Sequence, residues 1–182
     1  FTVGIDLSSD DKYFFITTSD HNTSEQYYFN VNEKNPQPKL IKKRERGIIY
    51  SVNSWNGKFY NQTNENAEDF KIDITDNLEK PNWKTFIAAK EEVLIGGLTF
   101  LNNWIIRSET SDALDKLFVK NITTGIEEEL LFSDESVYLC FSPKLPPSLF
   151  PPSVFVFFSR PQLPLPSFLL LPPKPFFEIN LR

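Results

Sequence analysis

A repeat of strand-like segments with a period of 45 residues constrains the fold more than any other feature of this sequence. A segment rich in aromatic and β-branched residues occurs three times, and a hydroxyl residue lies at the same place in each copy: Thr18, Thr63 and Ser108. A polar loop and a second strand-like run follow each copy. The paired runs are 13–20 with 25–30, 58–65 with 70–74, and 104–109 with 116–121.

Two further strand-like runs flank each pair. The preceding runs are 3–7, 48–52 and 98–101, and the following runs are 38–41, 83–87 and 128–132. Asn-Gly at 56–57 and Asn-Asn at 102–103 are typical of tight hairpins that need positive φ. Four short strands per period of about 45 residues are the signature of a β-propeller blade. The sequence therefore predicts an all-β chain with three four-stranded antiparallel blades, and an antiparallel sandwich is the alternative.

The composition changes sharply after residue 140. Of the 42 residues at 141–182, 32 are Phe, Ser, Pro or Leu, and this segment holds 11 of the 14 prolines. These four residue types share codons that begin with two pyrimidines, so a non-coding or frame-shifted stretch would produce this mixture. The alternative is a Pro-rich linker in an extended conformation. We therefore predict a partial propeller domain at 1–140 and an irregular, disordered or frame-shifted tail at 141–182.

Charge and composition exclude several classes of function. The formal net charge is -5, whereas nucleic-acid binding depends on excess positive charge, so we expect no nucleic-acid partner. One Cys and one His exclude an internal disulfide, a Cys-based zinc site and any site built from several His residues. No apolar run is longer than five residues, as at 154–158, which is far shorter than a membrane span of about 20 residues. We expect no metal, no cofactor and no membrane association, and the absence of an initiator Met suggests a fragment.

Few residues could carry chemistry. His21 follows Asp20 in a loop, where it could act as a base oriented by the carboxylate, but a solvated loop histidine is the favoured interpretation. A Gly-x-Ser-x-Gly nucleophile turn is missing from the sequence. Cys140 lies in a strand-like run, which favours a buried inert thiol over a reactive one. The sequence therefore predicts no catalytic residue and identifies no substrate-binding residue.

Four other groups have a functional and a structural interpretation. The basic cluster 42–46 could bind an acidic partner or lie in a solvated loop between blades. A group of acidic residues between positions 65 and 76 could hold a cation, but it lacks the Gly and the terminal Glu of an EF-hand loop. Gly96-Gly97 would let an inner strand approach the propeller axis, and three Asn-x-Ser/Thr triplets would be chance matches. The acidic group is Glu65, Glu68, Asp69, Asp73 and Asp76, and the triplets begin at Asn22, Asn61 and Asn121.

Several stretches, taken in order, resemble one peptidase family. The segments 14–25, 49–52 with 57–60, 64–72, and 83–87 followed by 92–97 are similar to blades of the prolyl oligopeptidase family of serine peptidases, in its oligopeptidase B branch. The resemblance runs from residue 1 to about residue 139. It implies a seven-bladed propeller that caps an α/β-hydrolase domain, with the catalytic triad in that other domain.

The resemblance implies a function for the parent enzyme rather than for this chain. The parent would be a serine endopeptidase that cleaves short peptides after basic residues, and its propeller would admit substrates by size. Its compartment would be the cytoplasm, or an organelle if a targeting segment was lost with the start of the gene. The partners of this chain would be those peptides and the hydrolase domain, and the chain alone would be inactive. A free-standing propeller that binds proteins or acts as a scaffold is the alternative. Because three blades cannot close a ring, the first and last blades should each expose an apolar face.

Overall fold

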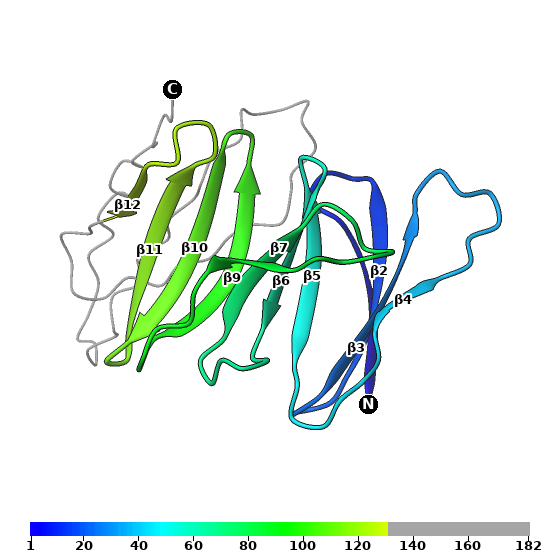
Figure 1. Ribbon diagram of the computed structural model, residues 1–182, viewed down its shortest axis with the longest axis horizontal. Helices are drawn as coiled ribbons and strands as arrows, with labels where there is room; N and C mark the ends of the chain where they lie inside the picture. The colour runs from blue at the N-terminus through cyan, green and yellow to red at the C-terminus, as the bar shows by residue number, and fades with distance from the viewer. Residues whose placement is uncertain (131–182) are drawn as a thin grey trace, which may run out of the picture. The chain divides into compact units, whose positions relative to one another are not determined.

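Residues 1–130 form three four-stranded antiparallel sheets in the computed structural model, which describes this part of the chain (Figure 1). This part contains no helix, and therefore none that could span a membrane. The all-β prediction with three blades is confirmed, and the three sheets do not close into a ring. Cys140 and the predicted tail 141–182 lie outside the described residues.

Each sheet is a meander in which every strand pairs with its neighbour in sequence. The hydroxyl residues that revealed the repeat, Thr18, Thr63 and Ser108, lie on the second strand of the first, second and third sheet. Sheet 1 contains β1 (Thr2–Leu7), β2 (Tyr13–Ser19), β3 (Ser24–Asn30) and β4 (Lys39–Lys42). Sheet 2 contains β5 (Tyr50–Trp55), β6 (Lys58–Thr63), β7 (Lys71–Thr75) and β8 (Lys84–Ile87). Sheet 3 contains β9 (Leu94–Leu101), β10 (Trp104–Ser111), β11 (Leu114–Asn121) and β12 (Glu127–Leu130).

Left-handed turn residues close the tight hairpins. Asn56 and Gly57 have φ values of 50° and 73°, and Asn102 has a φ of 41°, as their residue types predict. Asp112 and Ala113 form a further turn with φ values of 53° and 61°. The polar loop predicted between residues 109 and 116 is therefore wrong, because β10 and β11 continue to this turn and pair up to Ser111 and Leu114.

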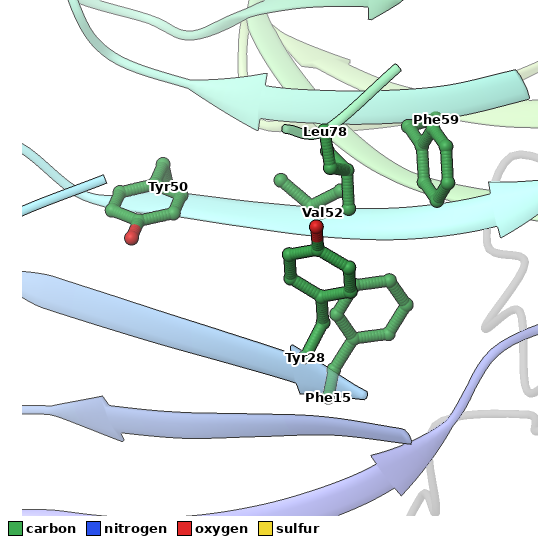
Figure 2. Packing of buried hydrophobic residues seen from close by; sticks show 6 residues of the cluster. All are labelled: Phe15, Tyr28, Tyr50, Val52, Phe59 and Leu78. Atoms are coloured by element: carbon green, nitrogen blue, oxygen red, sulfur yellow. The ribbon is translucent and has the colours of Figure 1, made fainter. Parts of the chain in front are cut away.

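An aromatic cluster joins the first two sheets. Phe15 and Tyr28 project from sheet 1 and pack against residues of sheet 2 and its β7–β8 loop (Figure 2). The residues that sheet 2 and its β7–β8 loop contribute are Tyr50, Val52, Phe59 and Leu78. Tyr13 lies at the edge of the cluster, with its ring centroid 5.3 Å from that of Phe59 and 6.1 Å from that of Tyr28. We call this set the first core cluster.

A second cluster joins sheets 2 and 3. It contains Tyr60, Ile72 and Ile87 from sheet 2, and Ile95, Phe100 and Ile105 from sheet 3. The adjacent residues Phe59 and Tyr60 of β6 thus belong to different clusters, although both are buried. Sheet 2 is therefore covered on both faces, and this explains why β6 lacks the alternation of apolar and polar residues that a half-exposed strand shows.

The outward face of sheet 1 is apolar and uncovered along β1. Val3, Ile5 and Leu7 are 72%, 58% and 47% exposed. The register places Ile5 opposite Ile16 and Leu7 opposite Phe14, so all five side chains share one face of the sheet. Exposed apolar patches of this kind mark association surfaces. The expected open face of the first blade is therefore present.

We expect Ile5→Lys to reduce self-association of the purified chain, because a charge at the centre of this face makes its burial against another molecule unfavourable. Sedimentation velocity at several protein concentrations would measure the effect. Asp6→Lys is the matched control, since Asp6 is the next residue and points to the other face of β1. An equal shift toward monomer in both variants would contradict an association through the outward face.

Gly96 and Gly97 form a β-bulge in β9. Arg107 pairs with Leu98 and Glu109 pairs with Ile95, so the two glycines lie opposite the single residue Ser108. A Cβ atom on Gly96 would lie 2.1 Å from Ser108 Oγ and 3.1 Å from the Ser108 carbonyl oxygen, whereas one on Gly97 would meet nothing within 4 Å. The close approach that requires glycine in the described residues is therefore that of Gly96 to the neighbouring strand, and the approach to the propeller axis stays a prediction.

Gly96→Ala should destabilise the fold by about 1–3 kcal/mol, since rotating the Ser108 hydroxyl away leaves the carbonyl contact in place. Gly97→Ala, with open space around it, should be neutral or stabilising by about 0.5 kcal/mol. Urea unfolding followed by circular dichroism would compare the two variants. Equal losses of stability would show that the strand requires both glycines for their backbone freedom rather than Gly96 for the space.

Candidate functional site between sheets 1 and 2

Side chains of β3 hydrogen-bond to the free backbone edge of β5. The Ser24 hydroxyl donates to the Tyr50 carbonyl at 2.8 Å and accepts from the Tyr50 N–H at 2.6 Å. The Gln26 side chain repeats this pattern one step further along, where its Oε1 accepts from the Val52 N–H at 2.8 Å and its Nε2 donates to the Val52 carbonyl at 3.4 Å. We call these contacts the polar seam. They satisfy backbone groups on the edge of β5 that faces away from its partner β6, where no strand pairs with it.

The Tyr50 hydroxyl closes the seam on the side of β4. It donates to the Lys42 carbonyl at 2.6 Å and accepts from the Gln26 N–H at 2.9 Å. Burial raises the pKa of Tyr50, so the hydroxyl stays protonated and keeps the hydrogen that it donates. One tyrosine of sheet 2 therefore connects two strands of sheet 1.

The β1–β2 turn extends the seam along β5. The Ser9 N–H donates to Asn53 Oδ1 at 3.0 Å, and Asn53 Nδ2 donates to Ser9 Oγ at 2.9 Å. The Ser54 hydroxyl donates to Asp10 Oδ2 at 3.0 Å, and Ser54 is fully buried. Polar residues of this turn are thus part of the contact between the sheets.

Gln26→Leu should lower the free energy of unfolding by about 2–3 kcal/mol, because it leaves the buried N–H and C=O of Val52 without partners. The exposed Gln37→Leu, with the same change of side chain, should stay within about 0.5 kcal/mol of the unchanged chain. Thermal or urea unfolding would measure both. Equal stability of the two variants would mean that the seam contributes nothing beyond packing.

A hollow of about 380 Å³ opens beside the first core cluster, between sheets 1 and 2. The rings of Tyr13, Tyr28 and Phe59 line it, together with Leu78. Its remaining lining residues are polar or charged: Asn30, Glu33, Lys39, Asp76, Asn77 and Glu79. Glu79 pairs with Lys39 and Asp76 pairs with Lys58, so Glu33 is the carboxylate of this lining that has no ion-pair partner among the described residues.

One ion pair spans the hollow from sheet 1 to the β7–β8 loop. Lys39 Nζ lies 2.7 Å from Glu79 Oε1, and both side chains are more than half exposed. The hydrogen bond between them raises the pKa of Lys39 and lowers the pKa of Glu79, so both are charged near neutral pH. Exposed pairs of this kind contribute little stability and exchange partners readily.

The Tyr28 hydroxyl has no hydrogen-bond partner among residues 1–130, although the residue is only 7% exposed. Figure 2 shows its ring extending from sheet 1 toward Val52 and Leu78, with the hydroxyl at the far end. Burial raises the pKa of Tyr28, so the hydroxyl is neutral at physiological pH. A polar group in this position would gain from a ligand that hydrogen-bonds to it.

A buried ion-pair network lies on sheet 3. Arg107 and Glu109 are each 3% exposed, and Arg107 makes a bidentate pair with Glu127 at 2.9 and 3.0 Å. Burial alone would lower the pKa of Arg107, but the hydrogen bonds and charges of Glu127 and Glu109 outweigh it and raise the pKa. Lys90 binds Glu109 through both carboxylate oxygens, at 2.7 and 2.8 Å. The charges of this network are paired with one another, so it serves sheet 3 rather than a ligand.

His21 lies exposed in the β2–β3 loop, and Asp20 is engaged elsewhere. Asp20 Oδ1 accepts hydrogen bonds from the N–H groups of Asn22 and Thr23, at 2.9 and 2.8 Å, and from the Thr23 hydroxyl. The Asn22 hydrogen bond is the largest of the effects that lower the pKa of Asp20. The carboxylate therefore shapes the loop and does not orient the imidazole.

The basic cluster 42–46 is only partly solvated. The Arg44 guanidinium donates to Thr23 Oγ1 and to the Thr18 carbonyl and hydroxyl, the last two at 2.7 and 2.6 Å. Lys42 Nζ forms an ion pair with Glu65. Arg44 and Lys42 thus hold the connection between sheets 1 and 2 in place through these contacts. The other three residues of the cluster, Lys43, Glu45 and Arg46, are exposed. The sequence did not predict this structural role.

The acidic residues proposed as cation ligands do not form a metal site within residues 1–130. Asp73 is buried and pairs with Lys71 at 3.0 Å, and Asp76 pairs with Lys58 at 2.7 Å.

Of the three Asn-x-Ser/Thr positions, Asn61 is buried in β6, and the Asn121 side chain caps the turn at 123–124. The sequence analysis missed both the hollow and the polar seam; the seam joins the two sheets, and the hollow is the candidate binding site.

Three consecutive meander sheets that pack face to face define this part of the chain as a set of β-propeller blades. The sequence matches the prolyl oligopeptidase N-terminal β-propeller domain over residues 1–146. The chain therefore belongs to this family, as the resemblance of its segments predicted.

Individual relatives agree with this assignment. The chain is 26% identical over 141 residues to dipeptidyl aminopeptidase BI of Pseudoxanthomonas mexicana, which covers 76% of the chain and 19% of that protein. Its fold is similar to oligopeptidase B from Trypanosoma brucei, with a TM-score of 0.68, 20% identity and coverage of 75% of this chain and 21% of that one. Oligopeptidase B from Leishmania major gives a TM-score of 0.67 at 16% identity, over 76% and 21% of the two chains. The chain thus spans about a fifth of the length of these relatives.

Proposed function

We propose that this chain is part of the propeller of a serine oligopeptidase that cleaves short peptides, with a preference for cleavage after basic residues. The observation that supports the proposal is the family match over residues 1–146, together with three sheets that have the fold of the oligopeptidase B propeller. In this proposal the propeller acts sterically. It covers a hydrolase domain, admits short flexible peptides and excludes folded proteins. The proposed compartment is the cytoplasm.

The described residues support a structural role rather than a catalytic one. Serine-peptidase chemistry needs a nucleophile, a His base and a carboxylate that orients it. The carboxylate beside His21 is held by Asn22 and Thr23 instead. The partners proposed for the chain are therefore a hydrolase domain and, in the complete enzyme, short peptides. The alternative, a free-standing propeller that binds proteins, would use the exposed face of sheet 1 as its contact surface.

The purified chain should not hydrolyse amides of arginine- or lysine-terminated peptides, because its sequence has no Gly-x-Ser-x-Gly nucleophile turn. A fluorogenic amide assay, with a serine-directed inhibitor as control, would measure this. Turnover that survives repurification and that the inhibitor abolishes would contradict a non-catalytic role.

Sequencing the gene beyond codon 140 separates the two functions. Further blades and a Gly-x-Ser-x-Gly turn support the peptidase, whereas a stop after the tail in independent transcripts supports the free-standing module.

A further inference from the structure

The hollow between sheets 1 and 2 combines three features that packing alone does not explain. Its floor is aromatic, the Glu33 carboxylate on its rim has no ion-pair partner among the described residues, and the Tyr28 hydroxyl opens into it without a hydrogen-bond partner in residues 1–130. Ligand sites in proteins are mostly apolar concavities with a few convergent polar groups, and volumes start near about 300 Å³. The volume of about 380 Å³ meets this size.

We propose that this hollow binds a primary ammonium or guanidinium group on a short aliphatic stem, which is the chemistry of a lysine or arginine side chain. The proposal does not depend on the peptidase function, because it rests only on residues of the first two sheets.

The floor suits the stem and the cation together. Tyr13 stands edge-on to both Phe59 and Tyr28, with centroid separations of 5.3 and 6.1 Å, so the three rings form one continuous apolar surface. Aliphatic carbons gain from contact with such a surface, and a cation gains from the negative face of an aromatic ring. An anionic group would be disfavoured both by the apolar surface and by the negative faces of the rings.

The rim supplies the counter-charge. Glu33 forms no ion pair among the described residues, where its carboxylate accepts only a 3.3 Å hydrogen bond from the Asn30 N–H. Glu79 is paired with Lys39 of the same rim, and that exposed pair can open. Lys39 therefore acts as an internal competitor that already occupies part of the cation site.

The Tyr28 hydroxyl supplies an uncharged acceptor in the lining. Because burial keeps this hydroxyl protonated, its oxygen can accept a hydrogen bond from an ammonium or guanidinium N–H while its own hydrogen remains in place. The site thus offers a ring floor, two carboxylates and one neutral oxygen to a single cationic head.

Isothermal titration of the full chain with Nα-acetyl-lysine methylamide and its arginine counterpart tests the proposal. Both should bind in the millimolar range, and the uncharged norleucine methylamide should bind about tenfold more weakly. A free diamine, 1,5-diaminopentane, tests whether the cation comes from a peptide side chain or from a free amine. Tighter binding of the amino-acid amides indicates a peptide side chain, and tighter binding of the diamine indicates a free amine. Equal affinity for lysine and norleucine amides, or no binding of either cation, overturns the proposal.

Three variants and two controls test whether the cation binds in this hollow. Glu33→Gln and Tyr28→Phe should each weaken binding of the lysine amide by about threefold. Lys39→Gln should strengthen it, because the internal competitor is removed. Glu128→Gln on β12 and Tyr27→Phe on the other face of β3 are the controls and should leave affinity unchanged. Weaker binding in Lys39→Gln, or equal effects in the control variants, would show that the cation binds elsewhere. Circular dichroism of each variant confirms that the fold persists.

Discussion

The free edge of β5 is the constraint on which the arrangement of the first two sheets depends. A sheet edge presents N–H and C=O groups that must find partners when they are buried. Here Ser24 and Gln26 act as substitutes for a strand, each bonding to both backbone groups of one residue. Apolar packing is not directional, so the aromatic cluster alone would allow the sheets to slide. The two side chains bond to alternate residues of β5, and this fixes the register of one sheet on the other.

A related solution joins sheets 2 and 3. Gln62 on β6 donates its amide to the Ile95 carbonyl at 2.8 Å, and the Ile95 N–H donates to the Asp69 carbonyl at 2.9 Å. Ile95, like Val52, lies on the first strand of its sheet. A glutamine of one blade thus reaches the first strand of the next blade in both cases. The second junction has fewer such bonds and depends more on its apolar cluster and on the cation–π contact of Lys120 with the Phe86 ring.

The sequence predicted the strands well because their signal is local. Runs of aromatic and β-branched residues, together with Asn56-Gly57 and Asn102, marked strands and turns that the structure confirms. The Asp112–Ala113 turn was missed since alanine rarely adopts positive φ. Ser24 and Gln26 gave no signal either, because a polar residue on a strand is usually taken to face solvent. The hollow depends on Tyr28 of β3 and Glu79 of a distant loop, and only the packing of two sheets brings these together.

The meander connections also affect how the chain reaches this structure. Every strand pairs with a sequence neighbour, and the seam contact between Ser24 and Tyr50 joins residues only 26 positions apart. Such topologies have a low loop-closure cost for each strand pairing, because the paired strands are close in sequence. During synthesis from the N-terminus, the sheets therefore emerge in the order in which they pack on one another. Sheet 1 is complete before β5 appears, and it then presents Ser24 and Gln26 as a template on which the next sheet can start.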